Sequence, residues 1–362
     1  MEYFEHFHSN TLAGSGNQHF FRTDDKEKVT RCCCLYKVFA GGTFPYAFLF
    51  SNTIDSTFSD GSVSHKNLVL DSWVIEEMYV GVTDFCDENS VEYPSVMRPV
   101  LFGGKKRRVV NPGELFASDP VELAAKAGQY LCLEILFSGE KIPYHEESII
   151  PSFLWEDGAW RPSKRHPFAS MVGAARPVKK KIAFLGDSIT QGIGTPVNSY
   201  AHWNAVLAEG LGQENAYWNL GLGFGRADDA ASDGIWLYKA KQNEIVFVCY
   251  GVNDILQGYS SESIKKNLQT IVDKLVEAGV RVILQTVPPF DYSPARRMIW
   301  EDVNEFILRE LKGADYVFDC VGCLGDAEQP YKAKFGGHPD AEGCKVWGEA
   351  LLEAVLSADA LR

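Results

Sequence analysis

The stretch KIAFLGDSITQG, residues 181–192, decides how the second half of this chain folds. It begins with a short, continuous apolar run, which is typical of a strand buried on both faces, and glycine, aspartate and serine follow at once. A serine at a turn from strand to helix exposes its hydroxyl and directs its own backbone N–H into the same space. Ser188 therefore has the placement of a nucleophile that also stabilises an oxyanion.

The pattern that begins here repeats to the end of the chain. Short apolar runs at 182–185, 216–220, 244–250, 281–287 and 316–318 alternate with amphipathic stretches at 200–209, 227–241, 261–278, 294–311 and 341–356. Nearly continuous apolar strands that alternate with helices are typical of a parallel sheet covered on both faces. The sequence therefore predicts a three-layer α/β domain over residues 176–362.

Residues 1–175 follow a different pattern. Short runs rich in Val, Tyr, Phe and Thr, at 46–51, 73–82, 108–110 and 130–137, are separated by clusters of Gly, Pro, Asn and Asp. This pattern predicts an antiparallel β-sandwich domain, with one short helical stretch near residues 121–127. Residues 161–181 contain seven Lys or Arg and no acid, and we interpret them as a solvated linker between the two domains.

The charge of the chain argues against one class of partner. Of the 362 residues, 35 are Lys or Arg and 48 are Asp or Glu, which gives a formal charge of -13. A general nucleic-acid binder needs clustered cationic side chains to contact phosphates, so we expect no nucleic-acid partner. An uncharged or cationic small substrate fits this balance better.

Three features predict where the protein resides. The first ten residues, MEYFEHFHSN, lack the apolar core of a secretory signal, and no run of about 18 apolar residues could span a membrane. The nine cysteines are an odd number in a long chain, which suits a reducing compartment better than a disulfide framework. We therefore expect a cytoplasmic protein with no membrane span.

In an open α/β sheet, ligands bind beyond the carboxyl ends of the strands, so reactive residues are expected in the loops there. The second apolar run leads into NLGLGFG, residues 219–225, whose glycines let backbone N–H groups approach a ligand. The third run leads into Asn253, an amide donor, and His338 lies just before Pro339 and the last amphipathic stretch. A serine, an imidazole and convergent N–H donors are the groups that acyl transfer needs.

These segments resemble the sequence blocks of the SGNH or GDSL-type hydrolases. The matching stretches, in the order that the family has, are GDSI at 186–189, NLGLG at 219–223, GVND at 251–254 and HP at 338–339. The resemblance implies a flavodoxin-like three-layer sheet and serine-esterase chemistry. Matched position by position, it implies that Ser188 is the nucleophile and an oxyanion N–H donor. Asn253 would be an oxyanion side-chain donor, and His338 the general base.

Two positions depart from the family pattern. The oxyanion glycine of the family falls on Phe224, whose backbone N–H can serve whatever its side chain, so the register within 223–225 stays open. The catalytic aspartate of the family falls on Phe335, which leaves no carboxylate to orient His338. A backbone carbonyl of residues 335–337 could accept the imidazole proton instead, or an acid of the preceding loop, Asp326 or Glu328, could replace the aspartate.

The first half of the chain has a second resemblance. Residues 111–131 are similar to the sandwich domain, jelly-roll-like, that precedes some bacterial GDSL-type esterases and acyltransferases. In such enzymes the extra domain can border the active-site cleft. The resemblance implies that the sandwich is an accessory domain that shapes the substrate site.

The sequence therefore predicts a serine esterase that hydrolyses small or carbohydrate-linked acyl esters, for example acetyl esters, through a Ser-His dyad or triad. An acyltransferase of the same mechanism is the first alternative. The second is a carbohydrate-binding protein whose catalytic machinery has decayed, an idea that Phe224 and Phe335 motivate. The mechanism needs no cofactor and no metal. The expected partner is a small-molecule or carbohydrate ester substrate, and a homo-oligomer is left open.

Overall fold

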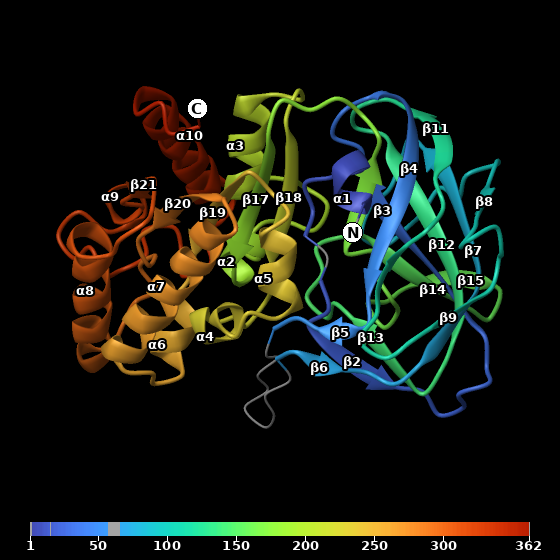
Figure 1. The fold of residues 1–362 in the computed structure, drawn as a ribbon, viewed down its shortest axis with the longest axis horizontal. Helices are drawn as coiled ribbons and strands as arrows, with labels where there is room; N and C mark the ends of the chain where they lie inside the picture. The colour runs from blue at the N-terminus through green and yellow to red at the C-terminus, as the bar shows by residue number, and fades with distance from the viewer. Residues whose placement is uncertain (1, 15, 57–65, 362) are drawn as a thin grey trace. The chain divides into compact units, whose positions relative to one another are not determined.

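The computed structural model describes residues 2–14, 16–56 and 66–361 (Figure 1). They form two compact units. The first holds residues 2–55, 66–179 and 216–218, and the second holds residues 56, 180–215 and 219–361. The predicted domain boundary between residues 175 and 176 stays a prediction. Within the described ranges, no helix combines the length and apolarity needed to cross a membrane.

The first unit contains two antiparallel sheets, which confirms the predicted sandwich class. One sheet has the order β1 (His8–Ser9), β16 (Met171–Ala174), β4 (Gly42–Ser51) and β10 (Leu115–Ala117), and β11 (Val121–Ala125) also pairs with β4. The other has the order β15 (Ala159–Pro162), β14 (Ser152–Glu156), β3 (Thr30–Lys37), β12 (Tyr130–Ser138), β7 (Trp73–Thr83) and β8 (Arg98–Val100), with β9 (Arg108–Val110) beside β7.

Shorter elements complete this unit. They are the helix α1 (Tyr3–His6) and two pairs of short strands, β2 (His19–Arg22) with β13 (Lys141–Tyr144) and β5 (Thr53–Ile54) with β6 (Leu68–Val69). The sandwich core is dense in aromatic and sulfur-containing side chains. Tyr36 of β3 is buried, and its hydroxyl accepts a hydrogen bond from the backbone N–H of Ala169, just before β16, at 3.0 Å. This bond links one sheet to the other.

Two predictions for the first unit were wrong. The expected helix near residues 121–127 is the strand β11, which pairs with residues 42–46 of β4. Its side chains alternate between exposed and buried positions, so pairing with β4 overrides the local helix propensity of Val-Glu-Leu-Ala-Ala. The expected linker at 161–181 contains β16, whose four residues are all buried because they pair with both β1 and β4.

The second unit is built on one sheet with the order β18 (Ala216–Gly221), β17 (Lys181–Gly186), β19 (Ile245–Cys249), β20 (Arg281–Gln285) and β21 (Tyr316–Phe318). Of β18, residues 219–221 belong to this unit. Strands β17, β19, β20 and β21 run parallel. In chain order the strands stand as 2-1-3-4-5, the flavodoxin-like arrangement that the sequence predicts. The strand β17 is buried from Ile182 to its end, as a central strand covered on both faces must be.

The helices of this unit, in chain order, are α2 (Ser188–Gln191), α3 (Trp203–Leu211), α4 (Ala227–Ala231), α5 (Ile235–Ala240), α6 (Val252–Leu256), α7 (Ser261–Glu277), α8 (Pro294–Arg309), α9 (Val321–Leu324) and α10 (Ala341–Ser357). Trp203 of α3 stacks on Trp347 of α10, with ring centroids 4.8 Å apart. The single helix expected over 227–241 is in fact two, α4 and α5. Asp233 between them has a left-handed φ of 56°, which an uninterrupted right-handed helix cannot contain.

This strand order determines where a ligand can bind. The chain runs outward from β17 to β18 and then returns to β19 on the other side of β17, so the direction of winding reverses between β17 and β19. In open α/β sheets, the crevice beyond the carboxyl ends of the strands at such a reversal is the usual ligand site. The segments that follow β17 and β19 carry Ser188 and Asn253.

Candidate active site

Ser188 is the first residue of α2, directly after β17. The strand can turn sharply there because Gly186 has no side chain: a Cβ at this position would collide with the Thr190 hydroxyl and lie 2.6 Å from the carbonyl oxygen of Cys249. Asp187 caps the helix, and its Oδ1 accepts a hydrogen bond from the N–H of Ile189 at 2.9 Å. Ser188 is 8% exposed, so its hydroxyl lies in a largely enclosed environment.

The turn that carries Ser188 is fixed from below by Asn219 of β18. The Nδ2 of Asn219 donates to the carbonyl oxygens of Thr190, at 3.2 Å, and Gln191, at 3.3 Å. Its Oδ1 accepts from the N–H of Gly221 at 2.9 Å. Gly221 must be a glycine because a Cβ there would run into the backbone nitrogen of Gln191. These bonds are buried, so the position of the serine is set by a closed hydrogen-bond network.

His338 lies on the loop before α10, and its Nε2 is 2.8 Å from the Oγ of Ser188. Backbone packing holds this loop, because a Cβ at Gly194 would lie 2.8 Å and 2.6 Å from the carbonyl oxygens of His338 and Pro339. The imidazole also meets the ring of Phe290 edge to face, with centroids 5.6 Å apart. Burial lowers the pKa of His338, which favours the neutral imidazole that a general base requires.

Among the described residues, no carboxylate is hydrogen-bonded to the imidazole of His338. In the part of the chain that the structure describes, Ser188 is the one residue that forms a hydrogen bond with the imidazole of His338. Asp326 is exposed, and its Oδ1 accepts the N–H groups of Glu328 and Gln329, so it caps its own loop. Phe335, at the position of the family's aspartate, is half-buried. Among the described residues, neither predicted acid nor a carbonyl of residues 335–337 forms a hydrogen bond with the imidazole.

Two N–H groups of the glycine-rich segment are hydrogen-bonded within the protein. The N–H of Gly223 donates to Oε1 of Gln191 at 2.7 Å, and the N–H of Gly225 donates to the carbonyl oxygen of Leu222 at 3.1 Å. Both groups therefore have partners inside the protein. Phe224 stands between them with a left-handed φ of 59°, a conformation that a glycine adopts more easily. Phe224 thus adopts a backbone conformation that favours glycine while it carries a large side chain.

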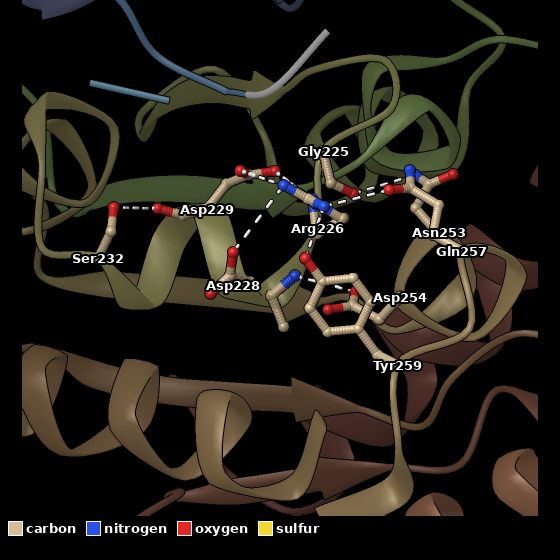
Figure 2. Close-up of polar contacts among 10 residues, drawn as sticks. Gly225, Arg226, Asp228, Asp229, Ser232, Asn253, Asp254, Gln257 and Tyr259 are labelled. Carbon is tan, nitrogen blue, oxygen red and sulfur yellow. Dashed lines mark hydrogen bonds and ion pairs between the residues drawn. The ribbon is translucent and has the colours of Figure 1, made fainter. Parts of the chain in front are cut away.

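Asn253 lies on α6, which begins after Gly251, a glycine with a φ of 124°. The Nδ2 of Asn253 donates to the carbonyl oxygen of Gly225 at 3.0 Å (Figure 2). It also lies 3.5 Å from Oδ2 of Asp187. These contacts bring the segments after β17, β18 and β19 together at one edge of the sheet. The structure therefore gathers Ser188 with His338, and Asn253 with the turn that contains Phe224.

Two buried carboxyl groups lie beside these residues. Burial raises the pKa of Asp187 to about 7, and the nearby negative charge of Asp254 adds to this effect. Burial also raises the pKa of Asp254 to about 7, although the hydrogen bond from the N–H of Ala227 opposes the shift. Each carboxyl group therefore carries a proton for part of the time near neutral pH.

Sequence reasoning missed several residues that shape this site: Gln191, Arg226, Asp229, Asp254 and Phe290. Asp254 stood within the matched stretch at 251–254, whereas Gln191 lies two positions after GDSI and Arg226 directly follows the glycine-rich segment. Their roles depend on partners far away along the chain, which no local pattern reveals. Within residues 2–14, 16–56 and 66–361, no group of three or more His, Cys, Asp or Glu could hold a metal ion.

Comparison with known proteins finds one family model that matches part of this unit. The sequence model of the GDSL-like lipase/acylhydrolase family matches residues 184–346. No curated protein matches the chain.

Similar solved structures cover about half of the chain. A member of the lipolytic protein G-D-S-L family from Veillonella parvula is 22% identical, with a TM-score of 0.40, over 48% of this chain and 97% of that one. A GDSL-like lipase from Bacteroides thetaiotaomicron is 20% identical, with a TM-score of 0.39, over 51% of this chain and 92% of that one. A carbohydrate esterase family 3 structure from Talaromyces cellulolyticus is 17% identical, with a TM-score of 0.36, over 49% of this chain and 96% of that one.

Proposed function

We propose that this protein is a serine esterase that acts through a Ser188–His338 dyad, because residues 184–346 match the model of the GDSL-like lipase/acylhydrolase family, a family of hydrolases. One observation carries the proposal: the Oγ of Ser188 and the Nε2 of His338 are 2.8 Å apart. A nucleophile and its base must lie within hydrogen-bond reach, and these two side chains meet that condition without rearrangement.

In the proposed reaction, His338 takes the proton of Ser188 while Oγ attacks the ester carbonyl carbon. The carbonyl oxygen becomes an oxyanion, which the backbone N–H groups of Ser188 and Phe224 and the amide of Asn253 stabilise. The amide carries two hydrogens: one is bonded to the carbonyl oxygen of Gly225, and the other, in a long contact of 3.5 Å with Oδ2 of Asp187, would turn from that carboxyl group to the oxyanion. The bond to the alkoxy group then breaks, and His338 gives its proton to the leaving alcohol. Water hydrolyses the acyl-enzyme by the same route.

The lack of a carboxylate on the imidazole does not rule out this mechanism. A triad aspartate holds the imidazole in one tautomer and stabilises its cation, and its loss in a model serine protease lowers the rate about 10⁴-fold. Here the edge-to-face contact with Phe290 and the packing on Gly194 fix the position of His338 without fixing its tautomer. We therefore expect a modest rate, with esters of good leaving groups hydrolysed fastest.

The proposed substrates are small or carbohydrate-linked acyl esters, and the test is a panel of acetyl to octanoyl esters with acetylated sugars. The variant is Ser188→Ala, and the control is Ser199→Ala, which removes an exposed serine of the same unit. We expect activity in the wild type and the control and none in Ser188→Ala, with an acyl adduct on Ser188 in the mass spectrum. Equal rates in wild type and Ser188→Ala would refute the serine mechanism.

If wild type and variant are equally inert on every ester, a carbohydrate-binding protein with decayed machinery becomes the better hypothesis. Transfer to another hydroxyl is tested in the same assay. A polyol acceptor diverts the acyl group to a new ester in an acyltransferase, whereas a hydrolase gives free acid.

A further inference from the structure

Arg226 has no part in the mechanism above, yet it is 7% exposed and directly follows the turn that contains Phe224. Its Nη2 lies 3.2 Å from Oδ1 of Asp229, which is itself buried. Its backbone N–H donates to the other oxygen of Asp229 at 2.9 Å. Side chain and backbone of Arg226 are thus bound to the same carboxylate (Figure 2).

The other side of the guanidinium reaches the segment after α6. Its Nη1 donates to Oε1 of Gln257 at 3.1 Å and to the hydroxyl of Tyr259 at 2.6 Å. The guanidinium carbon also lies 5.2 Å from the centroid of the Tyr259 ring, within the range of a cation–π interaction. Figure 2 shows Arg226 between Asp229 and these two residues.

Two more hydrogen bonds join the same two segments. The Nδ2 of Asn253 donates to the carbonyl oxygen of Gly225 at 3.0 Å. The N–H of Ala227 donates to Oδ2 of Asp254 at 3.0 Å. Residues 225–227 are therefore tied to the first turn of α6 at two points and, through the arginine, to its far end. The two proposed oxyanion donors, Phe224 and Asn253, lie within this small framework.

The framework needs a cation as well as a shape. Burial works against a charge on Arg226, but the negative charge of Asp229 and the hydrogen bonds to it outweigh burial and raise its pKa above the usual value. The same positive charge lowers the pKa of the Asp254 carboxyl group and so opposes the increase that burial causes. A planar guanidinium can bind a carboxylate, an amide oxygen and a hydroxyl in fixed directions, whereas a lysine ammonium cannot.

We propose that Arg226, clamped by Asp229, is a positioning residue of the esterase: it holds the turn at 224 and α6 at the separation at which the N–H of Phe224 and the amide of Asn253 both reach the oxyanion. This inference rests on the proposed function. Arg226 touches no reacting atom, so its effect passes entirely through the two donors. It therefore stabilises the transition state and contributes little to binding the uncharged ester.

The test compares Arg226→Gln, Arg226→Lys and Tyr259→Phe with a control, Arg309→Gln, whose arginine is exposed and pairs only loosely with Glu305. For each variant we would measure kcat and KM on p-nitrophenyl acetate, the inhibition constant of a boronic acid, and the melting temperature. The boronic acid forms a tetrahedral adduct with a serine, so its affinity reports on the oxyanion site separately from substrate binding.

Both Arg226 variants should lower kcat roughly 10- to 100-fold with KM changed less than about threefold, because a displacement of about 1 Å has effects of this size. The boronic acid should bind more weakly by the same factor, and Tyr259→Phe should lower kcat about threefold. The control should match the wild type.

A kcat of Arg226→Gln within about twofold of wild type would overturn the proposal, and so would full activity in Arg226→Lys, since charge alone would then suffice. If Arg226→Gln does not fold, Arg226→Lys and Tyr259→Phe decide the question in the same way. The proposed function is judged separately by Ser188→Ala. Loss of activity there with unchanged Arg226 variants refutes only the positioning role, whereas unchanged activity in Ser188→Ala refutes both.

Discussion

Ser188 and His338 are 2.8 Å apart, yet the chain holds them in opposite ways. Around the serine, the buried network of Asn219 satisfies backbone groups on both neighbouring segments. Around the histidine, contacts are steric: the ring of Phe290 and the close backbone approach at Gly194. One partner is fixed by directional bonds and the other by shape.

This difference shows what each kind of support can provide. Hydrogen bonds with buried partners fix both the position and the orientation of a group, because misplacing them leaves polar atoms unsatisfied. Packing fixes the position of a ring but does not distinguish its two nitrogens. We therefore expect the serine side to be sensitive in stability and the histidine side to be sensitive in catalysis.

The largest expected effect is that of His338→Gln. It should lower kcat roughly 10³-fold or more, because the base is lost. The melting temperature should change little, since the loop is held mainly by its backbone. Ester hydrolysis and thermal unfolding check both expectations, with Lys334→Gln, an exposed position on the same loop, as control. A variant that keeps a tenth of the activity would show that His338 is not the base.

On the serine side, Asn219→Ala should lower the free energy of unfolding by about 2–3 kcal/mol, because the carbonyl oxygen of Gln191 and the N–H of Gly221 each lose a buried partner. The carbonyl oxygen of Thr190 keeps its hydrogen bond from Asn204. Phe290→Leu, on the histidine side, should cost about 1 kcal/mol, since a half-buried ring is replaced by a smaller apolar group. Urea denaturation of both variants gives the comparison. Equal costs would contradict the distinction between the two supports.

Asp187 adds a pH dependence to the serine side. Burial raises its pKa from an ordinary 3.8 to about 7, so between these values the folded protein holds a proton that the unfolded chain releases. Its contribution therefore lowers stability as pH rises from about 4 to about 7. Asp187→Asn should stabilise the fold at pH 8 by roughly 4 kcal/mol relative to its effect at pH 4, because a shift of about three pKa units corresponds to that free energy. Unfolding measured at both pH values tests this, and a difference that does not depend on pH would refute it.

Phe335→Asp would give the imidazole of His338 a hydrogen-bond acceptor in addition to its packing contacts. A carboxylate at this position should raise kcat about tenfold, less than a full triad provides because the loop is not shaped for it. It should also raise the pKa of His338, so the acid limb of the pH–rate profile moves upward from below 6.5. Phe335→Asn, similar in size but uncharged, is the control, and an equal gain in both would exclude an electrostatic cause.

The smallest effect is expected at Phe224. Its left-handed φ of 59° costs a non-glycine residue about 1 kcal/mol, so Phe224→Gly should stabilise the fold by about that amount. The backbone N–H is retained, and kcat should stay within about threefold of wild type. Thermal unfolding and ester hydrolysis measure both. A large loss of activity would instead assign a substrate contact to the phenyl ring.

The sequence was most informative where local pattern and fold agree. The strand predicted at 316–318 coincides with β21, and the apolar run at 182–185 lies within β17, because buried parallel strands are nearly continuous apolar runs. The Ser188–His338 pair could be predicted because each residue belongs to a sequence block that follows a particular strand or precedes a particular helix. Its geometry still had to come from the structure.

What the sequence could not provide depends on partners distant along the chain. The strand β11 reads as a helix until β4 is placed beside it. Arg226 reads as one more charged residue until Gln257 and Tyr259 are brought to it from the end of α6. The raised pKa of Asp187 likewise comes from burial, which is a property of the assembled sheet and not of the motif.

The distribution of thiols allows the unfolding of each unit to be followed by cysteine labelling. All nine cysteines are unpaired, and eight are buried, Cys323 being the partly exposed one. The first unit holds Cys32, Cys33, Cys34, Cys86 and Cys132, and the second holds the other four. A thiol reagent should therefore label the native protein at one position, and the order in which peptides of the two units become labelled in denaturant would date the opening of each separately.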